Sequence, residues 1–307
     1  MRIAVRRAGL LTSIQDGGRW GHQAIGVPTA GPMDAWSHRL ANLLAGNAAT
    51  AAALEITATG PDLEFDAPAR VAIAGAEFEG TLDGSPWSSP VVLDVRGGSR
   101  LTFGVRRRGF RAYLAVAGSL DVPPVLGSRS TDLRSGIGGL DGRPLRDGDT
   151  LVVSTDRTSR RHAVSPPALR LPESGACRLR VIPGPDADPP DAFRVLIEHQ
   201  FTVSPQSDRM GYRLRGVPVP SDRAPRLSTP VAMGAIQLPP DGNPVLLMAE
   251  RQTTGGYPIV AVVISADLPL AGQLAPGDRA SFSPCTEEAA LAALIAREQP
   301  LLALEAS

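Results

Sequence analysis

Lysine is absent from this sequence of 307 residues, so all 31 of its Lys and Arg positions are arginines. The absence excludes chemistry that needs the chain's own lysine: a Schiff base, a phosphate-binding lysine of the Walker type, or attachment of biotin or lipoyl groups. The 31 acidic residues balance the arginines and give a formal net charge of zero. Because nucleic-acid binding rests largely on neutralising phosphates, this balance argues against a nucleic-acid-binding protein.

Cysteine and long apolar runs are also scarce. Cys177 and Cys285 are the only cysteines, and their wide separation is typical of a reducing compartment rather than a disulfide framework. The first residues lack the apolar stretch of a signal peptide, and the most apolar run, 259–264, is too short to cross a bilayer. We therefore expect a soluble, cytoplasmic protein. The four histidines lack the spacing of metal ligands, so we expect no metal site.

Glycine and proline, in contrast, are abundant: 32 and 29 residues, about a fifth of the chain against an ordinary share of ~12%. Between them lie short runs rich in Val and Ile, which are typical of strands joined by turns. We predict strands at 70–74, 91–95, 100–105, 111–116, 150–153, 178–182, 245–248, 259–264 and 279–282. Many short strands and few helices predict a mainly β protein built from barrels or sandwiches.

Two segments have the apolar period of a helix. The first, 33–46, begins at an acid, Asp34, that suits a helix start and ends at Gly46. The second, 287–297, has acids in its first turn, and we expect Pro300 to end it.

The length suggests two domains at roughly 150 residues each. We predict an N-terminal β-barrel domain over 1–155, a linker rich in Pro, Arg and Ser over 156–176, and a C-terminal β-barrel domain over 177–307. Residues 145–152 and 274–281 share a Gly-Asp turn between similar flanks. This similarity between the two segments indicates either an internal duplication or a strand–turn pattern that recurred by chance.

A polar, glycine-rich segment follows the first strand-like run and carries Gln15, Asp16 and Arg19. One interpretation is a loop that faces a ligand with these three side chains. The other is a glycine turn stabilised by an ion pair between Asp16 and Arg19.

Two further acids are candidates for acid–base chemistry. Asp34 stands at a helix start, where capping and the helix dipole explain an acid without any catalytic role. Glu55 lies between aliphatic residues of a strand-like run. If its side chain points inward, it must be paired or its pKa must rise, which would suit a general acid or base; on the solvated face it would be ordinary.

The second half contains two polar clusters. Arg209, Tyr212 and Arg213 surround a glycine, and arginine is suited to bind carboxylates or phosphates, although a surface ion-pair cluster would look the same. The segment 252–257 lies between apolar runs, and its hydroxyls, amide and flexible glycines suit an oxyanion-binding loop. A plain hairpin loop would also use the two glycines but has less need of the Gln-Thr-Thr run. The predicted substrate-binding residues of this segment are Gln252, Thr253, Thr254, Gly255, Gly256 and Tyr257. The glycines at 136, 138 and 139 indicate only a turn.

These clusters are part of a longer series of motifs. In order along the chain the series comprises 12–19 (TSIQDGGR), 26–34 (GVPTAGPMD), 41–47 (ANLLAGN), 54–57 (LEIT), 72–76 (AIAGA), 113–118 (YLAVAG), 208–214 (DRMGYRL), 234–237 (GAIQ), 252–258 (QTTGGYP) and 273–278 (QLAPGD). In this ordered set the chain resembles the allophanate hydrolase subunit 2 or Kip-A-like proteins, also called the biotin-dependent carboxyltransferase family.

The resemblance implies cyclophilin-like β-barrels and an obligate Kip-I-like partner. In free-standing bacterial members the two chains are the C and B subunits of ATP-dependent 5-oxoprolinase, which works with a third subunit that is LamB/YcsF-like. The resemblance therefore implies opening of 5-oxoproline to glutamate, with ATP bound at a partner interface. It adds Gln237 to the substrate-binding residues, and we assign catalysis to Asp34, Glu55 and Arg209, expected to share one cleft with the 252–257 loop.

Two other functions stay open for members of this family. One is a carboxyltransferase of the urea carboxylase type, with biotin on a separate carrier. The other is a non-enzymatic antagonist of a kinase inhibitor. Many relatives carry a basic residue directly after the Gly-Gly-Tyr-Pro motif, where this chain has Ile259, and this departure weakens the carboxyltransferase interpretation.

Overall fold

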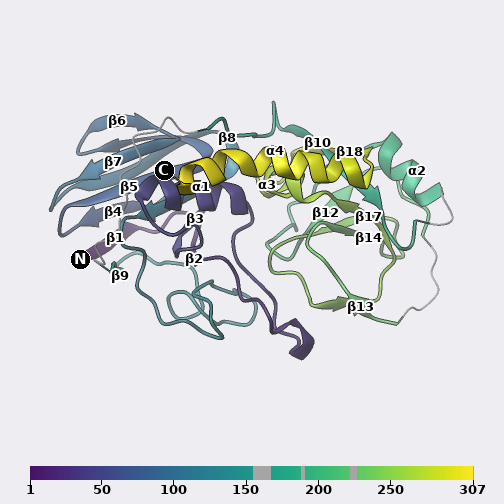
Figure 1. Cartoon of the computed structure of the whole chain (residues 1–307), viewed down its shortest axis with the longest axis horizontal. Coiled ribbons are helices and arrows are strands. Elements are labelled where there is room, and N and C mark those ends of the chain that lie inside the picture. The colour runs from purple at the N-terminus through teal and green to yellow at the C-terminus, as the bar shows by residue number, and fades with distance from the viewer. Residues whose placement is uncertain (155–166, 188–190, 222–226, 307) are drawn as a thin grey trace. The chain divides into compact units, whose positions relative to one another are not determined.

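Strands dominate the chain, as predicted: 38% of the residues are in strands and 17% in helices. The computed structural model describes residues 1–154, 167–187, 191–221 and 227–306, and it divides into two compact units (Figure 1). Unit 1 comprises Met1–Trp20, Ala30–Leu171 and the end of the chain from Gln299, and unit 2 comprises Gly21–Thr29 and Pro172–Glu298. The first part of the predicted linker, 156–166, lies outside the described residues.

Unit 1 is built on a curled, nine-stranded antiparallel sheet with the shape of a half-barrel. Six strands follow the order β2-β3-β8-β4-β1-β9, and β5 pairs with β8 and carries β6 and β7. The bounds are β1 Arg2–Arg7, β2 Leu11–Gln15, β3 Ala53–Thr57, β4 Asp62–Phe65, β5 Ala69–Leu82, β6 Ser85–Ser88, β7 Val91–Val95, β8 Arg100–Val116 and β9 Thr150–Val152. The predicted strands 100–105 and 111–116 are the two ends of β8, which continues through register shifts against β5.

Side-chain alternation along β8 separates the two faces of this sheet. Leu114 and Val116 lie in the main apolar core, whereas Tyr113 and Ala115 belong to a second core beneath helix α1, Ala35–Ala45. The run is therefore apolar on both faces, and α1 packs on β5 and β8.

Helix α1 begins and ends where the sequence predicts. The Asp34 carboxylate accepts hydrogen bonds from the backbone N–H of Ser37 at 2.9 Å and from its hydroxyl at 2.6 Å. Gly46 closes the helix in the left-handed region at φ 83°, a conformation that glycine adopts without strain.

Unit 2 contains a closed seven-stranded barrel in the order β10-β17-β14-β15-β12-β11-β18. These strands are β10 Ala176–Pro183, β11 Gln200–Val203, β12 Gly211–Arg215, β14 Ala235–Gln237, β15 Val245–Leu247, β17 Ile259–Val263 and β18 Arg279–Pro284. The pair β10–β18 is parallel and the other pairs are antiparallel. The smaller elements are η1 Gln23–Ile25, α2 Asp191–Glu198, η2 Ser265–Asp267, α3 Leu268–Gly272 and a two-stranded sheet of β13 Thr229–Pro230 with β16 Thr254–Gly255.

The prediction for the last helix is wrong at its end. Helix α4 spans Glu287–Ala306 and contains Pro300, which was expected to end it. A proline inside a helix costs about 3 kcal/mol. Leu301 and Leu304 are buried with α1, and burying a leucine contributes about 1.5–3 kcal/mol each, enough to offset that cost. No helix of the described residues is both long enough and apolar enough to span a membrane.

His38 on α1 makes the stability of unit 1 depend on pH. Its ring is buried, its Nε2–H donates to the Gln15 carbonyl at 3.0 Å, and burial lowers its pKa to about 4. Between pH 6.5 and 4 the unfolded chain binds a proton that folded His38 does not, so we expect the free energy of unfolding to fall by about 3 kcal/mol as the pH is lowered through this window.

This expectation is tested by denaturant unfolding followed by tryptophan fluorescence, because Trp20, Trp36 and Trp87, the three tryptophans, all lie in unit 1. His38→Asn should flatten the pH dependence between 6.5 and 4, whereas His22→Asn should leave it unchanged. An equally steep profile in His38→Asn would contradict the assignment.

Candidate functional site

The predicted site residues fall into two groups. Gln15, Asp16, Arg19, Asp34 and Glu55 belong to unit 1, and Arg209, Tyr212, Arg213, Gln237 and the segment 252–257 belong to unit 2. The cleft predicted to be shared by both groups therefore stays a prediction.

Asp16, at the end of β2, holds a second loop of unit 1 in place. Its carboxylate accepts hydrogen bonds from the Ser128 hydroxyl at 2.6 Å, the Ser130 hydroxyl at 2.7 Å, and the backbone N–H groups of Gly18 at 3.0 Å and Arg129 at 2.5 Å. Burial raises the pKa of Asp16, but these hydrogen bonds outweigh the effect and hold the pKa below its usual value. A carboxylate with four donors is occupied by its own loop.

Arg19 is buried in the same loop. It donates to the carbonyls of Val125 at 2.9 Å and Ser130 at 2.8 Å, while its Nη1 has no hydrogen-bond partner among the described residues. Burial lowers the pKa of Arg19, and the charges of Asp132 and Asp16 oppose that shift. The described residues contain no ion pair between Asp16 and Arg19, so that interpretation of the loop is wrong.

The predicted turn at 136–139 closes over Arg19. Gly138 has a φ of 71°, and a Cβ there would clash with the Ser130 carbonyl and lie 2.7 Å from Arg19 Nη2. Glycine is therefore required because the loop packs directly against the buried guanidinium.

Glu55 and Asp34 are connected through Tyr113. The Tyr113 hydroxyl donates to Glu55 Oε2 at 2.8 Å and accepts the Asp34 backbone N–H at 2.8 Å. Glu55 Oε2 also accepts the Met33 N–H at 2.8 Å, and its Oε1 lies 3.9 Å from Arg111 Nε. Glu55 therefore points inward, the alternative in which it must be paired. Since Asp34 caps α1 and Glu55 holds the turn before it, these contacts support a structural role, and catalysis by either acid stays a prediction.

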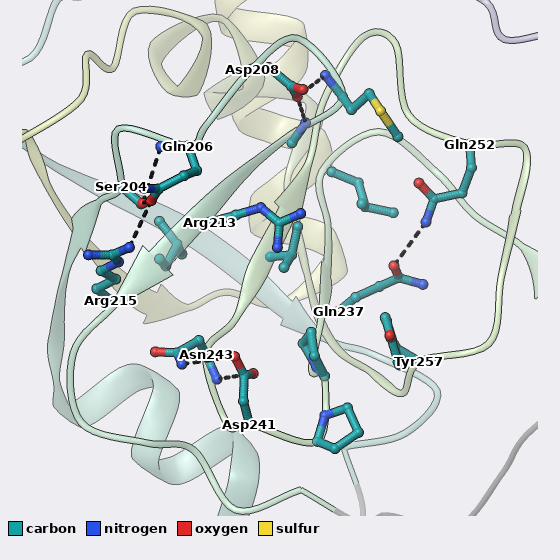
Figure 2. A pocket seen from close by; sticks show the side chains of 17 residues that line it. Ser204, Gln206, Asp208, Arg213, Arg215, Gln237, Asp241, Asn243, Gln252 and Tyr257 are labelled. Atoms are coloured by element: carbon teal, nitrogen blue, oxygen red, sulfur yellow. Dashed lines mark hydrogen bonds between the residues drawn. The ribbon is translucent and has the colours of Figure 1, made fainter. Parts of the chain in front are cut away.

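Unit 2 contains an open cavity of about 940 Å³ between barrel strands and their connecting loops (Figure 2). Its polar lining residues are Ser204, Gln206, Asp208, Arg213, Arg215, Gln237, Asp241, Asn243, Gln252 and Tyr257. Four predicted binding residues thus meet in one cavity: Arg213, Gln237, Gln252 and Tyr257. Its size is that of a pocket for a drug-sized ligand.

Arg213 on β12 supplies the cavity with a cation (Figure 2). Among the described residues its guanidinium has no hydrogen bond or ion pair, whereas neighbouring Arg215 donates to Gln206 at 2.7 Å. The Asn243 backbone N–H and side-chain amide, with a smaller effect of the Arg213 charge, hold the pKa of Asp241 below its usual value. The Asp241 carboxylate is thus engaged mainly by Asn243, and Arg213 is available to an anionic ligand.

Two side-chain amides stand on another side of the cavity. Gln252 Nε2 donates to Gln237 Oε1 at 3.2 Å, and the buried Gln237 Nε2 has no hydrogen-bond partner among the described residues. A Cβ at Gly255 would clash with Gln237 Nε2, so a larger residue there would require the Gln237 amide to shift. A buried amide donor without a partner is costly unless a ligand or water accepts from it.

Arg209 and Tyr212 are buried beside the cavity and do not line it. Arg209 Nε contacts Glu250 Oε1 at 2.6 Å, both side chains being 3% exposed. The Arg209 guanidinium is thus buried in an ion pair and does not reach the cavity through the described lining residues. Its predicted catalytic role therefore has no direct support from this cavity.

The rest of the predicted loop forms a small sheet. Thr254 and Gly255 pair with β13, and the Thr253 carbonyl accepts the Val231 N–H at 3.1 Å. Thr253, Thr254 and the two glycines are not in the cavity lining, and their role as an oxyanion-binding loop stays a prediction.

Sequence reasoning missed two sets of residues. Ser128 and Ser130 bind Asp16, and the signal available was a serine-rich run that precedes the glycine turn. Glu250 pairs with Arg209, and it lies two residues before the first residue of the 252–257 motif. The described residues contain no group of three or more His, Cys, Asp or Glu side chains arranged to hold a metal ion.

Comparisons with known proteins give a consistent picture. The family "Carboxyltransferase domain, subdomain A and B" matches residues 25–284. The chain is 41% identical over 298 residues to the C subunit of 5-oxoprolinase from Escherichia coli K12, covering 95% of this chain and 94% of that protein.

Two crystal structures are similar to the whole fold. TTHA0988 superposes with a TM-score of 0.84 at 40% identity, over 92% of this chain and 55% of that chain. The Kluyveromyces lactis urea amidolyase superposes with a TM-score of 0.90 at 30% identity, over 99% of this chain and 20% of that chain. This chain therefore spans about half of the first protein and a fifth of the second.

The Arg209–Glu250 pair should be essential to the stability of unit 2. Glu250→Ala removes the carboxylate from a buried guanidinium, and we expect the free energy of unfolding, measured by urea denaturation and circular dichroism, to fall by about 3–5 kcal/mol. Replacing both residues, with Arg209→Met and Glu250→Leu, should restore most of it because no charge stays buried.

The exposed α2 pair Arg194–Glu198 is the control: Glu198→Ala should leave the free energy of unfolding almost unchanged, because solvent screens this pair. If the double variant is as unstable as Glu250→Ala alone, packing rather than charge pairing sets the cost.

Proposed function

The chain belongs to the carboxyltransferase family of subdomains A and B, and we propose that it acts as the C subunit of an ATP-dependent 5-oxoprolinase. The observation that carries this proposal is the 41% identity to the E. coli C subunit over 94% of that protein's length. In the proposed reaction, 5-oxoproline is opened to glutamate.

The cavity of unit 2 has the chemistry that this substrate needs. 5-Oxoproline carries a carboxylate and a lactam amide. Arg213 has free donors for a carboxylate, a pairing that arginine makes with two parallel hydrogen bonds. The Gln237 and Gln252 amides have both donors and acceptors for the lactam C=O and N–H.

We assign ATP and part of the catalysis to the other subunits. A five-membered lactam is a poor electrophile, and transfer of the γ-phosphoryl group to its oxygen activates the carbonyl carbon. Water then adds to that carbon, and the C–N bond breaks as nitrogen takes up a proton, which leaves an acyl phosphate. A second water hydrolyses this acyl phosphate to the carboxylate of glutamate and free phosphate. Since the sequence has neither lysine nor a nucleotide-binding motif, we place ATP at the interface with the Kip-I-like and LamB/YcsF-like subunits.

A second candidate is a carboxyltransferase of the urea carboxylase type. It is favoured by the TM-score of 0.90 to the K. lactis urea amidolyase over 99% of this chain. Biotin would have to come on a separate carrier protein, because this chain has no lysine to hold it.

The test is reconstitution of the three purified proteins with 5-oxoproline and ATP. In that mixture, Arg213→Ala should lower kcat/KM for 5-oxoproline by roughly 10- to 100-fold, the loss expected when hydrogen bonds to a charged group worth about 1.5–3 kcal/mol are removed. Arg279→Ala, which removes an exposed arginine of β18 outside the cavity lining, is the matched control and should leave the rate unchanged.

Glutamate formed equally well without this chain would exclude the proposal. ATP-dependent carboxylation of urea with a biotin carboxylase and its carrier, in place of lactam opening, would favour the second candidate.

A further inference from the structure

Arg251 is a half-buried cation of unit 2 that no part of the proposed reaction uses. Its Nε donates to the Val231 carbonyl at 3.2 Å, and its Nη1 donates to the Met248 carbonyl at 3.4 Å and the Thr29 hydroxyl at 3.4 Å. Three separate segments of unit 2 thus hold this guanidinium in one orientation.

No carboxylate neutralises Arg251 within the described residues. Two other partly or fully buried arginines of unit 2 have an acid in contact: Arg209 has Glu250 at 2.6 Å, and Arg180 has Asp267 at 2.7 Å. Burial lowers the pKa of Arg251, and no acid offsets that effect. A charge removed from water without a counter-charge is costly, so the site favours the arrival of an anion.

The donor that stays available is Nη2. Arginine has five N–H donors in a planar fork, and here Nε and Nη1 are fixed by oxygens of the protein. Nη2 has no hydrogen-bond partner among the described residues, and it is not enclosed within the protein. The guanidinium is therefore preorganised with one edge open, as oxyanion binding requires.

Arg251 lies next to a residue of the cavity described above. It directly precedes Gln252, whose side chain lines the cavity, but Arg251 is not itself part of the cavity lining. The Thr29 hydroxyl at its Nη1 is buried and is a second polar group at the same place. Any anion held there would be distinct from one held by Arg213.

We propose that Arg251 and Thr29 form an oxyanion subsite that binds a phosphate or carboxylate group. This proposal does not depend on the identity of the amide substrate, because it rests only on the Arg251 guanidinium and the groups that contact it. Its failure would leave the proposed role of Arg213 unchanged.

The first test uses the full-length wild-type chain and phenylglyoxal, which modifies accessible guanidinium groups. Peptide mass mapping measures the labelling rate of Arg251 with and without inorganic phosphate or acetate. An anion at about ten times its Kd leaves about a tenth of the sites free, so Arg251 labelling should slow about tenfold. Labelling of exposed Arg279 in the same digests should not change.

Slower labelling with phosphate than with acetate supports a phosphoryl subsite, and the reverse supports a carboxylate subsite. If neither phosphate nor acetate slows the labelling of Arg251 at any concentration tested, the proposal is overturned.

Variants provide a second measurement that separates binding from structure. Arg251→Gln keeps an amide donor for the surrounding carbonyls but removes the charge, and Arg251→Lys keeps the charge. Without added anion, Arg251→Gln should be at least as stable as wild type. Added phosphate should no longer raise the Tm of Arg251→Gln, whereas it should still raise the Tm of Arg251→Lys in part. A destabilised Arg251→Gln that still gains Tm with phosphate as wild type does would show a purely structural role.

Discussion

Removing a guanidinium from water is costly unless the protein supplies oxygen atoms or a counter-charge in place of the solvent. This constraint acts throughout a chain whose 31 basic residues, histidine apart, are all arginines. Arg209 has Glu250, Arg180 has Asp267, and Arg111 lies 3.9 Å from Glu55. Each of these pairs joins segments far apart in the sequence, so neutralising the charges also fixes loops and strands relative to one another within a unit.

The same constraint separates structural cations from cations available to ligands. Arg209 and Arg213 belong to one short motif, yet the first is buried in an ion pair and the second lines a cavity. Alternation along β12 explains the difference for the strand itself: Tyr212 and Leu214 are buried, whereas Arg213 and Arg215 are exposed. A ligand-binding arginine has to lie on the exposed side, without an acid of its own.

Much of the fold was predictable because it follows from local rules. Short Val- and Ile-rich runs between turns are strands, and Asp34 and Gly46 end α1 for capping reasons that act within one turn. The end of α4 was not predictable, because the leucines that carry the helix past Pro300 are buried against α1, some 250 residues earlier in the chain. Similarly, the joining of two predicted strands into β8 depends on its pairing with β5.

The candidate site was predictable in its residue types but less so in its grouping. Arg213, Gln237, Gln252 and Tyr257 come from three separate motifs, and only closure of the barrel brings them to one cavity. The sequence around Glu55 was compatible with either a solvated or an inward side chain. The strand register, which places Glu55 opposite Tyr113 on β8, determines that the side chain points inward. The inward position is tolerated because Tyr113 and the Met33 N–H satisfy the carboxylate. A buried acid satisfied in this way fixes the turn before α1, whereas the unsatisfied Gln237 amide and the unneutralised Arg213 leave hydrogen-bonding capacity for a ligand.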